Sequence, residues 1–325
     1  MPDLSIVFVN WNSSDYLRAC LRSIYSQTRG VTFEIIVVDN ASPNDDLDGL
    51  KREFPGIQLI KSKENLGFAR ANNAGFKQSS GECVLFLNPD TEVLGSAIPE
   101  MLRQLQSLPY AGTVECKLLN SDMSIQTSCI QRFPTILNQL LDIEALRLRW
   151  PACGLWRIAP LFSAAQQPVE TEVISGACLM IRRNVFEAVG LFSEDYFMYA
   201  EDVDLCFKVH RAGFKNYYVG GARVVHHGGG SSKQQSSDQW STVAQKEAIL
   251  QLCRKTRGPL YALLFRASTA AAAVVRLIAV FPMLVMGQAA APRQRMISAR
   301  KKWAAILRWS IGFETATLRS PSRRS

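Results

Sequence analysis

The sequence predicts an α/β fold in which a mixed, mostly parallel sheet is covered by helices on both faces. Three observations lead to this prediction: the strand-like segments are apolar throughout, helix-like segments separate them, and several of them end on a polar or acidic residue. Strands that are buried on both faces need helices on each side. The carboxyl ends of parallel strands then lie along one edge of the sheet, where ligands bind.

Four strand-like segments and two helix-like segments alternate over the first 90 residues. The predicted strands are Leu4–Val9, Glu34–Asp39, Gln58–Lys61 and Cys83–Leu87. The predicted helices between them are Ser14–Gln27 and Ala69–Gln78. Asn10, Asp39 and Asp90 end or follow three of these strands, so we expect them at the carboxyl edge of the sheet.

The second half is predicted to continue the same domain after an irregular insertion. Residues 132–170 contain four prolines, which indicates an insertion, and a lid on the acceptor side is one interpretation. Order is predicted to resume at Glu172–Ile181. The elements predicted after it are a strand over Tyr217–His226 and helices over Asn184–Val189, Asp202–Arg211 and Asp238–Arg254. Residues 1–255 are expected to form the main domain, and residues 256–325 a helical, basic extension.

Charge is divided unevenly between these two parts. The net charge is +9, but residues 1–250 carry 23 Lys/Arg and 27 Asp/Glu, whereas residues 251–325 carry 14 Lys/Arg and the single acid Glu314. A body of −4 with an extension of +13 predicts an anionic partner, either nucleic acid or an anionic membrane surface. Nucleic acid is disfavoured because the body has no binding motif and no interleaving of aromatic with basic residues.

Composition and the first residues indicate a globular protein of a reducing compartment. The 325 residues are 47% hydrophobic and 20% charged, which excludes wholesale disorder. The eight cysteines are spread singly without a C-x-x-C pair, and this favours buried thiols over disulfides or a zinc site. Met1 leads almost directly into the first strand, without the basic region and cleavage site of a signal peptide, so a cytoplasmic location is expected.

The basic extension is predicted to associate with a membrane without crossing it. The apolar segment Pro259–Pro292 is interrupted by Arg266 and Arg276, and its longest uncharged run is 16 residues, short of the roughly 20 that a spanning helix needs. Arg293–Ile311 is predicted to form a basic amphipathic helix whose stripe around Trp303 suits an anionic membrane surface. The alternative is that the apolar segment forms a helical hairpin packed on the body.

Two common nucleotide-binding motifs are absent from the sequence. No G-x-G-x-x-G follows the first strand, where the turn reads Asn10-Trp11-Asn12-Ser13-Ser14, so a dehydrogenase is disfavoured. The P-loop pattern does not occur either. A sugar-1-phosphate nucleotidyltransferase would carry a Gly-rich, basic loop at the same turn, which disfavours that class as well.

Seven short motifs follow one another along the chain. They are Ser5–Asn12, Val37–Ser42, Asn65–Asn73, Phe86–Asp90, Ser175–Ala177, Glu201–Asp204 and His226–His227. In this order and spacing they resemble the inverting family-2 glycosyltransferases with the GT-A fold, rhamnosyltransferase-like members in particular, over about residues 3–255. The resemblance implies a nucleotide-diphospho-sugar transferase whose donor is a thymidine- or uridine-diphosphate sugar, specifically dTDP-rhamnose, and whose acceptor is a lipid-linked or polysaccharide glycan.

The resemblance also implies which residues bind the nucleotide sugar. They are Asn10, Asp39, Asn65, Gly67, Asn73 and Gly176. Asp39, at the end of a buried strand, can accept a hydrogen bond from the ring N–H of uracil or thymine, although an aspartate there can also cap a turn or helix. Gly67 permits a tight backbone turn between a strand and a helix, whereas Asn65 and Asn73 can equally cap local structure.

Asp90 and His226 are the candidate ligands of a divalent cation. A carboxylate after the fourth strand suits Mg²⁺ or Mn²⁺, which would neutralise the charge that grows as a diphosphate leaves. The family motif is often Asp-x-Asp, and Asn88 stands in its first position here, which weakens the prediction of metal dependence. The resemblance implies that His226 completes the site, and His227 is the alternative because a strand sends neighbouring side chains to opposite faces.

An acidic cluster at a predicted helix start holds the candidate catalytic base. Glu201, Asp202 and Asp204 lie within four residues, beside apolar neighbours that can raise a carboxyl pKa toward the range of a general base. The resemblance assigns the base to Asp202, with Glu201 or Asp204 orienting or structural. Acids also favour helix N-termini through the helix dipole, which is the alternative explanation.

The function expected from the sequence is an inverting glycosyltransferase of polysaccharide or cell-envelope biosynthesis, peripheral on the cytosolic face of a membrane. It would use one base, Asp202, and a diphosphate site around Asp90, His226 and a cation, with no covalent protein intermediate. A catalytically silent saccharide- or membrane-binding scaffold of the same fold is the alternative, because Asn88 departs from the family motif.

Overall fold

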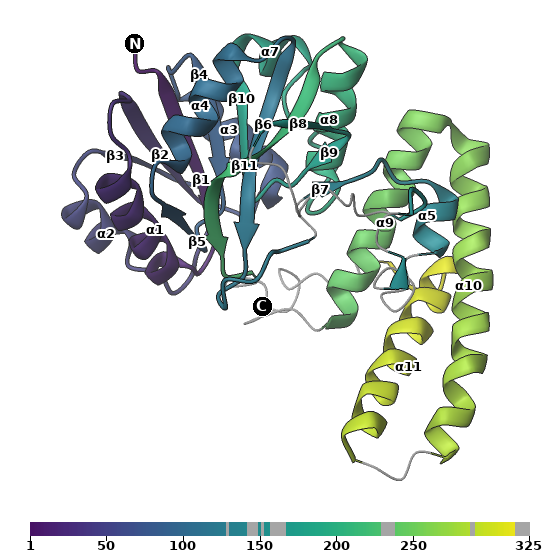
Figure 1. The fold of residues 1–325 in the computed structure, drawn as a ribbon. Coiled ribbons are helices and arrows are strands. Elements are labelled where there is room, and N and C mark those ends of the chain that lie inside the picture. The colour runs from purple at the N-terminus through teal and green to yellow at the C-terminus, as the bar shows by residue number, and fades with distance from the viewer. Residues whose placement is uncertain are drawn as a thin grey trace. The chain divides into compact units, whose positions relative to one another are not determined.

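The computed structural model describes residues 1–127, 130–141, 149–150, 153–156, 167–228, 238–286 and 290–315. The chain divides into two units, whose elements Figure 1 labels. The first unit consists of Met1–Phe133, Arg157–Phe197 and Glu201–Gln234, and the second of Pro134–Trp156, Met198–Ala200 and Gln235–Ser325. Residue 255, where the sequence analysis places a domain border, lies inside helix α9 (Asp238–Arg257) of the second unit.

A nine-stranded sheet forms the centre of the first unit, in the order β3-β2-β1-β4-β10-β6-β11-β5, with β8 also paired to β11. Its strands are β1 (Leu4–Asn10), β2 (Phe33–Asp39), β3 (Ile57–Lys61), β4 (Cys83–Leu87), β5 (Thr91–Leu94), β6 (Ala111–Leu119), β8 (Val169–Thr171), β10 (Cys178–Arg182) and β11 (Lys215–His226). Strands β3, β2, β1 and β4 are parallel, β10 is antiparallel to both of its neighbours, and β11 is parallel to β6. The mixed α/β fold predicted from the sequence is confirmed.

The four strands predicted in the first 90 residues pair as a parallel group, with Asn10 of β1 opposite Asp39 of β2. The segment Glu172–Ile181, where order is predicted to resume, contains two strands, β9 (Val173–Ile174) and the greater part of β10. The turn Ser175–Ala177 separates them, and β9 pairs with β7 (Ile130–Gln131) in a second, two-stranded sheet. This turn is one of the seven motifs, and its backbone contacts both Asp202 and Asn88.

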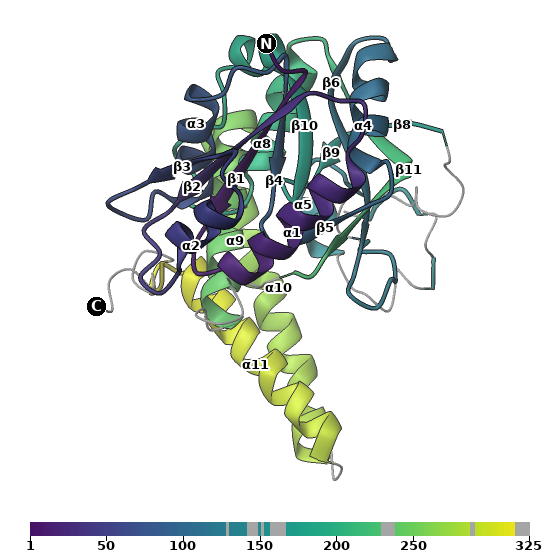
Figure 2. The ribbon, with the colours of Figure 1, turned by 90° about the vertical axis from the view of Figure 1, so that its left-hand side faces the viewer.

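Helices cover both faces of the large sheet. They are α1 (Ser14–Gln27), α2 (Leu47–Glu53), α3 (Gly67–Lys77), α4 (Ala97–Ser107), α7 (Arg183–Ala188) and α8 (Glu201–Arg211). Ile6 and Phe8 of β1 belong to a core shared with α1, α2 and α4, and α1 lies across this face in Figure 2. On the other face Phe76 of α3 and Phe186 of α7 contact each other, and Phe186 also contacts Phe86 of β4. Successive strand residues point to opposite faces, which is why both sides of β1 and β4 are apolar.

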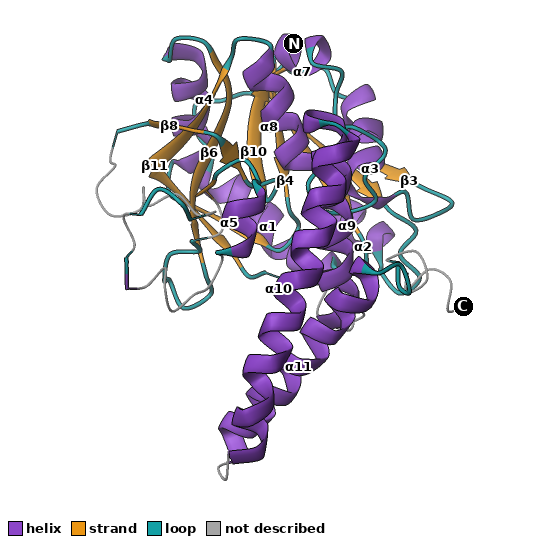
Figure 3. Cartoon of the chain, turned by 90° about the vertical axis from the view of Figure 1, so that its right-hand side faces the viewer, coloured by secondary structure: helices purple, strands orange, loops and turns teal. Residues whose placement is uncertain are grey.

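The second unit is helical. Its described helices are α5 (Ile136–Leu140), α9, α10 (Pro259–Met286) and α11 (Ala290–Ser310). Helices α9, α10 and α11 share one apolar core, and α10 and α11 run side by side (Figure 3). The two arginines of α10 are used inside this unit: Arg266 donates to the carbonyls of Trp309 and Ser310, and the Arg276 guanidinium lies 4.2 Å from the Trp303 ring centre.

The structure changes two expectations about the extension. In its described part, one helical segment, Pro259–Val280 of α10, is long and apolar enough by length and composition to cross a membrane. The α11 stripe that the sequence analysis assigns to a membrane surface is largely used within the unit, because Arg276 covers Trp303 and because Ile306 and Ser310 of the stripe are buried.

Candidate active site

Asn10, the last residue of β1, holds the loop that follows β2. Its side chain is fully buried and donates to Asp45 Oδ2 over 2.7 Å and to Ser42 Oγ over 3.2 Å, and it accepts from Ser13 Oγ. Both amide hydrogens are therefore used within the protein. The side-chain amide of Asn10 therefore holds the loop after β2 in place, and the nucleotide contact that the resemblance implies stays a prediction.

Asp39, the last residue of β2, closes the turn that follows it and keeps one oxygen for a ligand. Its half-buried carboxylate accepts a hydrogen bond from the Ser42 N–H through Oδ1, at 3.0 Å. In the described part of the chain, Oδ2 has no hydrogen-bond partner. The turn role and an acceptor role toward a nucleobase are therefore compatible.

Gly67 brings the next loop close to the segment that precedes α8. Its φ is +77°, and a Cβ at this position would lie 2.3 Å from the Phe197 carbonyl oxygen, so only glycine fits without movement. The neighbouring Phe68 N–H donates to that same oxygen at 2.9 Å. Asn65 Oδ1 accepts from the Gly67 N–H and from Asn40 Nδ2, which ties the loop to the end of β2.

Gly67→Ala is expected to lower the free energy of unfolding by about 2–5 kcal/mol, since it adds a left-handed backbone cost to a steric clash. Gly213→Ala is the matched control: Gly213 also has a positive φ, +85°, but no atom lies within 4 Å of a Cβ there. The control is expected to cost only about 1–2 kcal/mol, the backbone part alone. Urea unfolding of the two variants measures the difference, and equal costs would show that the Phe197 contact is unimportant.

Asn73 is buried and bonded to the segment that leads to α8. Its side chain is 2% exposed, donates to the Phe192 carbonyl at 2.9 Å and accepts from the Phe192 N–H at 3.1 Å. Nδ2 also lies 3.3 Å from Glu194 Oε1. Through these bonds Asn73 fixes the segment leading to α8, and its role toward a nucleotide stays a prediction.

His226, the last residue of β11, is held beside Asp90 with a defined tautomer. Its Nδ1 lies 2.7 Å from Gln126 Oε1, and because a carbonyl oxygen only accepts hydrogen bonds, Nδ1 carries the proton. In the neutral ring Nε2 then presents a lone pair, 3.3 Å from Asn88 Nδ2 and 3.4 Å from Asp90 Oδ1. A lone pair facing a carboxylate oxygen is an arrangement that a shared cation stabilises, so these side chains fit a divalent ion.

His227 points elsewhere. Its ring nitrogens lie 2.9 Å from Glu92 Oε1 and 2.8 Å from Ser121 Oγ. Of the two histidines, His226 therefore shares a site with the Asp90 carboxylate. Among the described residues no group of three or more His, Cys, Asp or Glu side chains gathers for a metal, so a cation here would have Asp90 and His226 as its ligands of these types.

Asp202 is the half-buried member of the acidic cluster at the start of α8, whereas Glu201 and Asp204 are buried. Its Oδ2 accepts from the Gly176 N–H at 2.9 Å, and its Oδ1 accepts from the Val203 N–H at 2.8 Å. A Cβ on Gly176 would lie 3.4 Å from that of Asp202, an ordinary van der Waals contact, so it is the Gly176 N–H rather than the missing side chain that acts on Asp202. Gly176 therefore orients the candidate base.

The turn Ser175–Ala177 connects the candidate base to the candidate cation ligands. The Asn88 N–H donates to the Ala177 carbonyl at 2.9 Å, which places the turn beside the loop that carries Asp90. The adjacent residue of the turn donates to Asp202. One short turn thus borders both the candidate base, Asp202, and the Asp90–His226 pair.

Glu115 of β6 is a buried acid next to this turn that the sequence analysis does not single out. It is 0% exposed, and its Oε2 accepts from the Ser175 N–H at 3.0 Å. Burial raises the pKa of Glu115 well above its ordinary value. The sequence signal that could have identified Glu115 is that it is the one acidic residue of the largely apolar segment Ala111–Leu119. An acid in such a segment indicates a buried polar group.

Asp204 and Glu201 have structural surroundings. Asp204 accepts from Ser193 Oγ at 2.5 Å and lies 3.7 Å from Lys208 Nζ, so it anchors the segment before α8. Glu201 is 6% exposed, and burial together with the charge of Asp202 raises the pKa of Glu201.

Glu201→Gln is expected to stabilise the protein increasingly as the pH rises. Because the pKa of Glu201 is raised in the folded state, that state keeps a proton that the unfolded chain loses above about pH 4.3. The wild-type free energy of unfolding therefore falls as the pH rises from that value through the raised pKa, and glutamine removes this loss. Thermal unfolding of both proteins between pH 5 and about 9 measures it, and a difference that does not change with pH would contradict the assignment.

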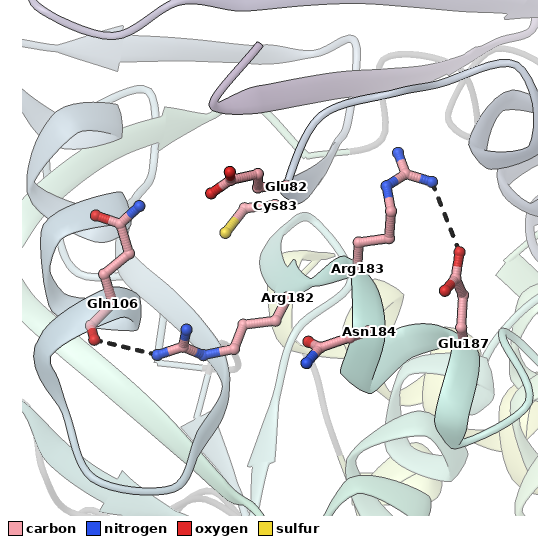
Figure 4. Close-up of a pocket in the computed structure, with 7 residues that line it drawn as sticks. All are labelled: Glu82, Cys83, Gln106, Arg182, Arg183, Asn184 and Glu187. Carbon is pink, nitrogen blue, oxygen red and sulfur yellow. Dashed lines mark hydrogen bonds and ion pairs between the residues drawn. The ribbon is translucent and has the colours of Figure 1, made fainter. Parts of the chain in front are cut away.

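A cavity of about 340 Å³ lies at the opposite edge of the sheet (Figure 4). It is lined by Cys83, the first residue of β4, and Arg182, the last residue of β10, which pair across the sheet. Arg182 donates to the carbonyls of Gln106 and Ala111, and Arg183 to the carbonyl of Gly81. Both arginines are thus occupied in capping chain segments, and the cavity is separate from the carboxyl edge.

The fold and the motifs have counterparts among known proteins. Agl10 of Haloferax volcanii, a low-salt glycan biosynthesis hexosyltransferase, is 30% identical over 229 residues, which are 69% of this chain and 66% of Agl10, just under two thirds of its length. The N-acetylglucosaminyl-diphospho-decaprenol L-rhamnosyltransferase of Mycobacterium tuberculosis is 29% identical over 235 residues, 68% of this chain and 75% of that protein.

A solved structure supports the fold. The mannosyltransferase PcManGT from Pyrobaculum calidifontis, in complex with GDP-Man and Mn²⁺, matches with a TM-score of 0.56 at 17% identity, over 96% of this chain and 87% of that one. This likeness confirms the GT-A fold. The family model described as glycosyl transferase family 2 matches residues 5–190, more than half of the chain. The chain therefore belongs to glycosyl transferase family 2.

Proposed function

We propose that the chain is an inverting glycosyltransferase that moves rhamnose from dTDP-rhamnose to a lipid-linked glycan. The observation that carries the proposal is the turn Ser175–Ala177, which holds the Asp202 carboxylate and borders the loop of Asp90 and His226. A base for an acceptor hydroxyl and a place for a diphosphate then lie at one edge of the sheet, as a direct displacement requires.

Asp202 is suited to the role of base because its orientation is fixed and its side chain stays partly accessible. The two N–H donors, from Gly176 and Val203, hold both oxygens in place. In the proposed step Asp202 takes the proton of the acceptor hydroxyl as its oxygen forms a bond to the anomeric carbon. The bond from that carbon to the diphosphate breaks, and the diphosphate leaves with the electron pair.

A divalent cation, Mg²⁺ or Mn²⁺, would be held by Asp90 and His226. When bound, such an ion neutralises negative charge on the leaving diphosphate. Gln126 supports this role by accepting a hydrogen bond from the His226 Nδ1–H, so that Nε2 has the lone pair that a cation would take in place of the Asn88 amide. The Mn²⁺ of the similar PcManGT complex is consistent with this assignment.

The donor and acceptor are proposed from the site and from the relatives together. Asp39 Oδ2 can accept from the ring N–H of thymine. A relative of 29% identity is an L-rhamnosyltransferase named for a diphospho-decaprenol acceptor, which supports rhamnose and a lipid-linked acceptor. A lipid-linked acceptor and an extension of +13 favour a place on the cytosolic face of an anionic membrane.

Purified protein incubated with a panel of nucleotide sugars and a GlcNAc-diphospho-lipid acceptor tests the proposal. Transfer from dTDP-rhamnose, above transfer from the other donors, is the expected result. Transfer from a different nucleotide sugar would overturn the donor assignment alone. Binding of nucleotide sugars without transfer or hydrolysis would favour the alternative, a catalytically silent scaffold.

A further inference from the structure

Helix α10 carries an exposed apolar surface that nothing in the proposed reaction uses. Six of its large apolar side chains are between 42% and 69% exposed, and we call them the α10 stripe: Leu260, Leu263, Leu264, Val274, Val275 and Ile278. At 3.6 residues per turn they fall within about a third of the helix circumference and extend over about 27 Å of its length. Ala267 and Ala271, also exposed, continue the surface between them. A continuous apolar surface of this length marks a binding site.

The α10 stripe contains no charged side chain, although α10 contains two arginines. Arg266 and Arg276 both point inward, where they bind carbonyls of the second unit and lie over Trp309 and Trp303. The polar groups of the helix are thus gathered on its inner side. The outer side of α10 carries the apolar side chains of the stripe, which suit contact with an apolar environment.

The charge around the α10 stripe identifies its partner as an anionic one. Between residues 248 and 313 the sequence has eleven Lys/Arg and no acidic residue. A second copy of this chain would bring two strongly positive surfaces together, which opposes self-association. Apolar side chains among basic ones are suited to the surface of a bilayer with anionic headgroups.

The packing of α11 against α10 decides how the helix meets the bilayer. Arg300, Lys301 and Lys302 of α11 are exposed, and α11 runs along α10 within the same apolar core. If α10 crossed the membrane, α11 would carry these charges into the hydrocarbon. The pair of helices therefore suits the interface, with the α10 stripe toward the acyl chains.

We infer that the α10 stripe is a membrane-docking surface: α10 lies in the plane of an anionic bilayer with Leu260 to Ile278 inserted, and does not cross it. This inference rests on the proposed function in one respect, because a lipid-linked acceptor requires the enzyme to work at a membrane. It differs from the sequence prediction, which assigns membrane contact to the Trp303 stripe of α11.

Sedimentation of the full-length protein with phosphatidylcholine vesicles, with and without phosphatidylglycerol, tests the inference. Wild type is expected to sediment with the anionic vesicles and to be partly released by high salt. Leu263→Glu/Ile278→Glu is expected to lose binding by about tenfold or more, because it places two charges in the inserted surface. Tyr110→Glu/Met123→Glu, an equal charge change at exposed residues of the first unit, is the matched control and should bind like wild type.

Four outcomes would overturn the inference. The wild-type protein could fail to bind the anionic vesicles, the Leu263→Glu/Ile278→Glu variant could bind them as tightly as wild type, or the control variant could lose binding to the same extent. The fourth outcome is that bound wild-type protein resists alkaline carbonate extraction, which would indicate a spanning helix. Transfer to a water-soluble acceptor analogue, expected to be equal in all three proteins, shows that the variants are folded. It also separates the two proposals, because a protein that binds vesicles but transfers no sugar contradicts the proposed function alone.

Discussion

Asp202→Asn is expected to lower the rate of sugar transfer by about 10²–10⁴-fold, the usual contribution of a general base. The asparagine keeps the size of the side chain and can still accept the Gly176 N–H, but it cannot take a proton from the acceptor hydroxyl. Because the base acts on the acceptor, donor affinity should be nearly unchanged. Steady-state kinetics and titration with the nucleotide diphosphate measure the two effects separately.

Asp204→Asn is the informative comparison for this prediction. Asp204 is buried and bonded to Ser193, so its substitution should lower the melting temperature rather than selectively lower turnover. Near-wild-type turnover in Asp202→Asn, together with loss of turnover in a folded Asp204→Asn, would reassign the base to Asp204.

His226→Ala is expected to weaken binding of the nucleotide diphosphate by about tenfold or more in the presence of Mn²⁺, and to leave binding of the nucleoside unchanged. The reason is that an ion held by Asp90 and His226 contacts only phosphates. His227→Ala is the matched control, since its ring bonds to Glu92 and Ser121 instead. Calorimetric titration of nucleoside and nucleotide diphosphate against the two variants, with Mn²⁺ and with EDTA, makes the measurement.

Asp90→Ala should behave like His226→Ala, and neither variant should respond to EDTA. A wild-type affinity for the diphosphate that is the same with Mn²⁺ and with EDTA would contradict the cation assignment. Positive charge from the protein itself would then have to replace the ion.

The parallel half of the sheet was predictable because its strands are buried on both faces. Segments such as Glu34–Asp39 have no polar residue at every second position. They form strands that pair through backbone hydrogen bonds in the parallel arrangement that the predicted α/β fold requires. The carboxyl-edge positions of Asp39 and Asp90 follow from the same argument. The sequence alone was therefore sufficient to predict where Asp39 and Asp90 lie in the fold.

The middle of the sheet was harder to predict. Strand β6 contains Gly112, Glu115 and Lys117, which interrupt its apolar pattern, and it lies between strands far apart in the sequence. The motif Ser175–Ala177 was visible in the sequence, but its place between β9 and β10 was not, because the apolar residues on its two sides do not show where one strand ends and the next begins. Glu115 became visible as part of the site once the fold brought β6 to that turn.

The direction in which a side chain points was the other feature that the sequence alone could not predict. A motif places Asn10 and Asn73 near the site, but whether their amides point to a ligand or into the protein depends on neighbours such as Asp45 and Phe192. The same holds for α11, where Trp303 of the expected stripe lies under Arg276 and Ile306 is fully buried. The apolar surface that the extension exposes is the α10 stripe. Only the packing of the helices shows that this surface, and not the α11 stripe, is exposed.

The anomeric configuration of the transferred sugar tests the central claim most directly. A single displacement, with Asp202 as base and the diphosphate leaving from the opposite side, must invert the anomeric centre of the donor. The product of transfer from dTDP-rhamnose, analysed by NMR, is therefore expected to have the configuration opposite to that of the donor. Retention of configuration would contradict the account, because it requires a chemistry other than one base and one displacement.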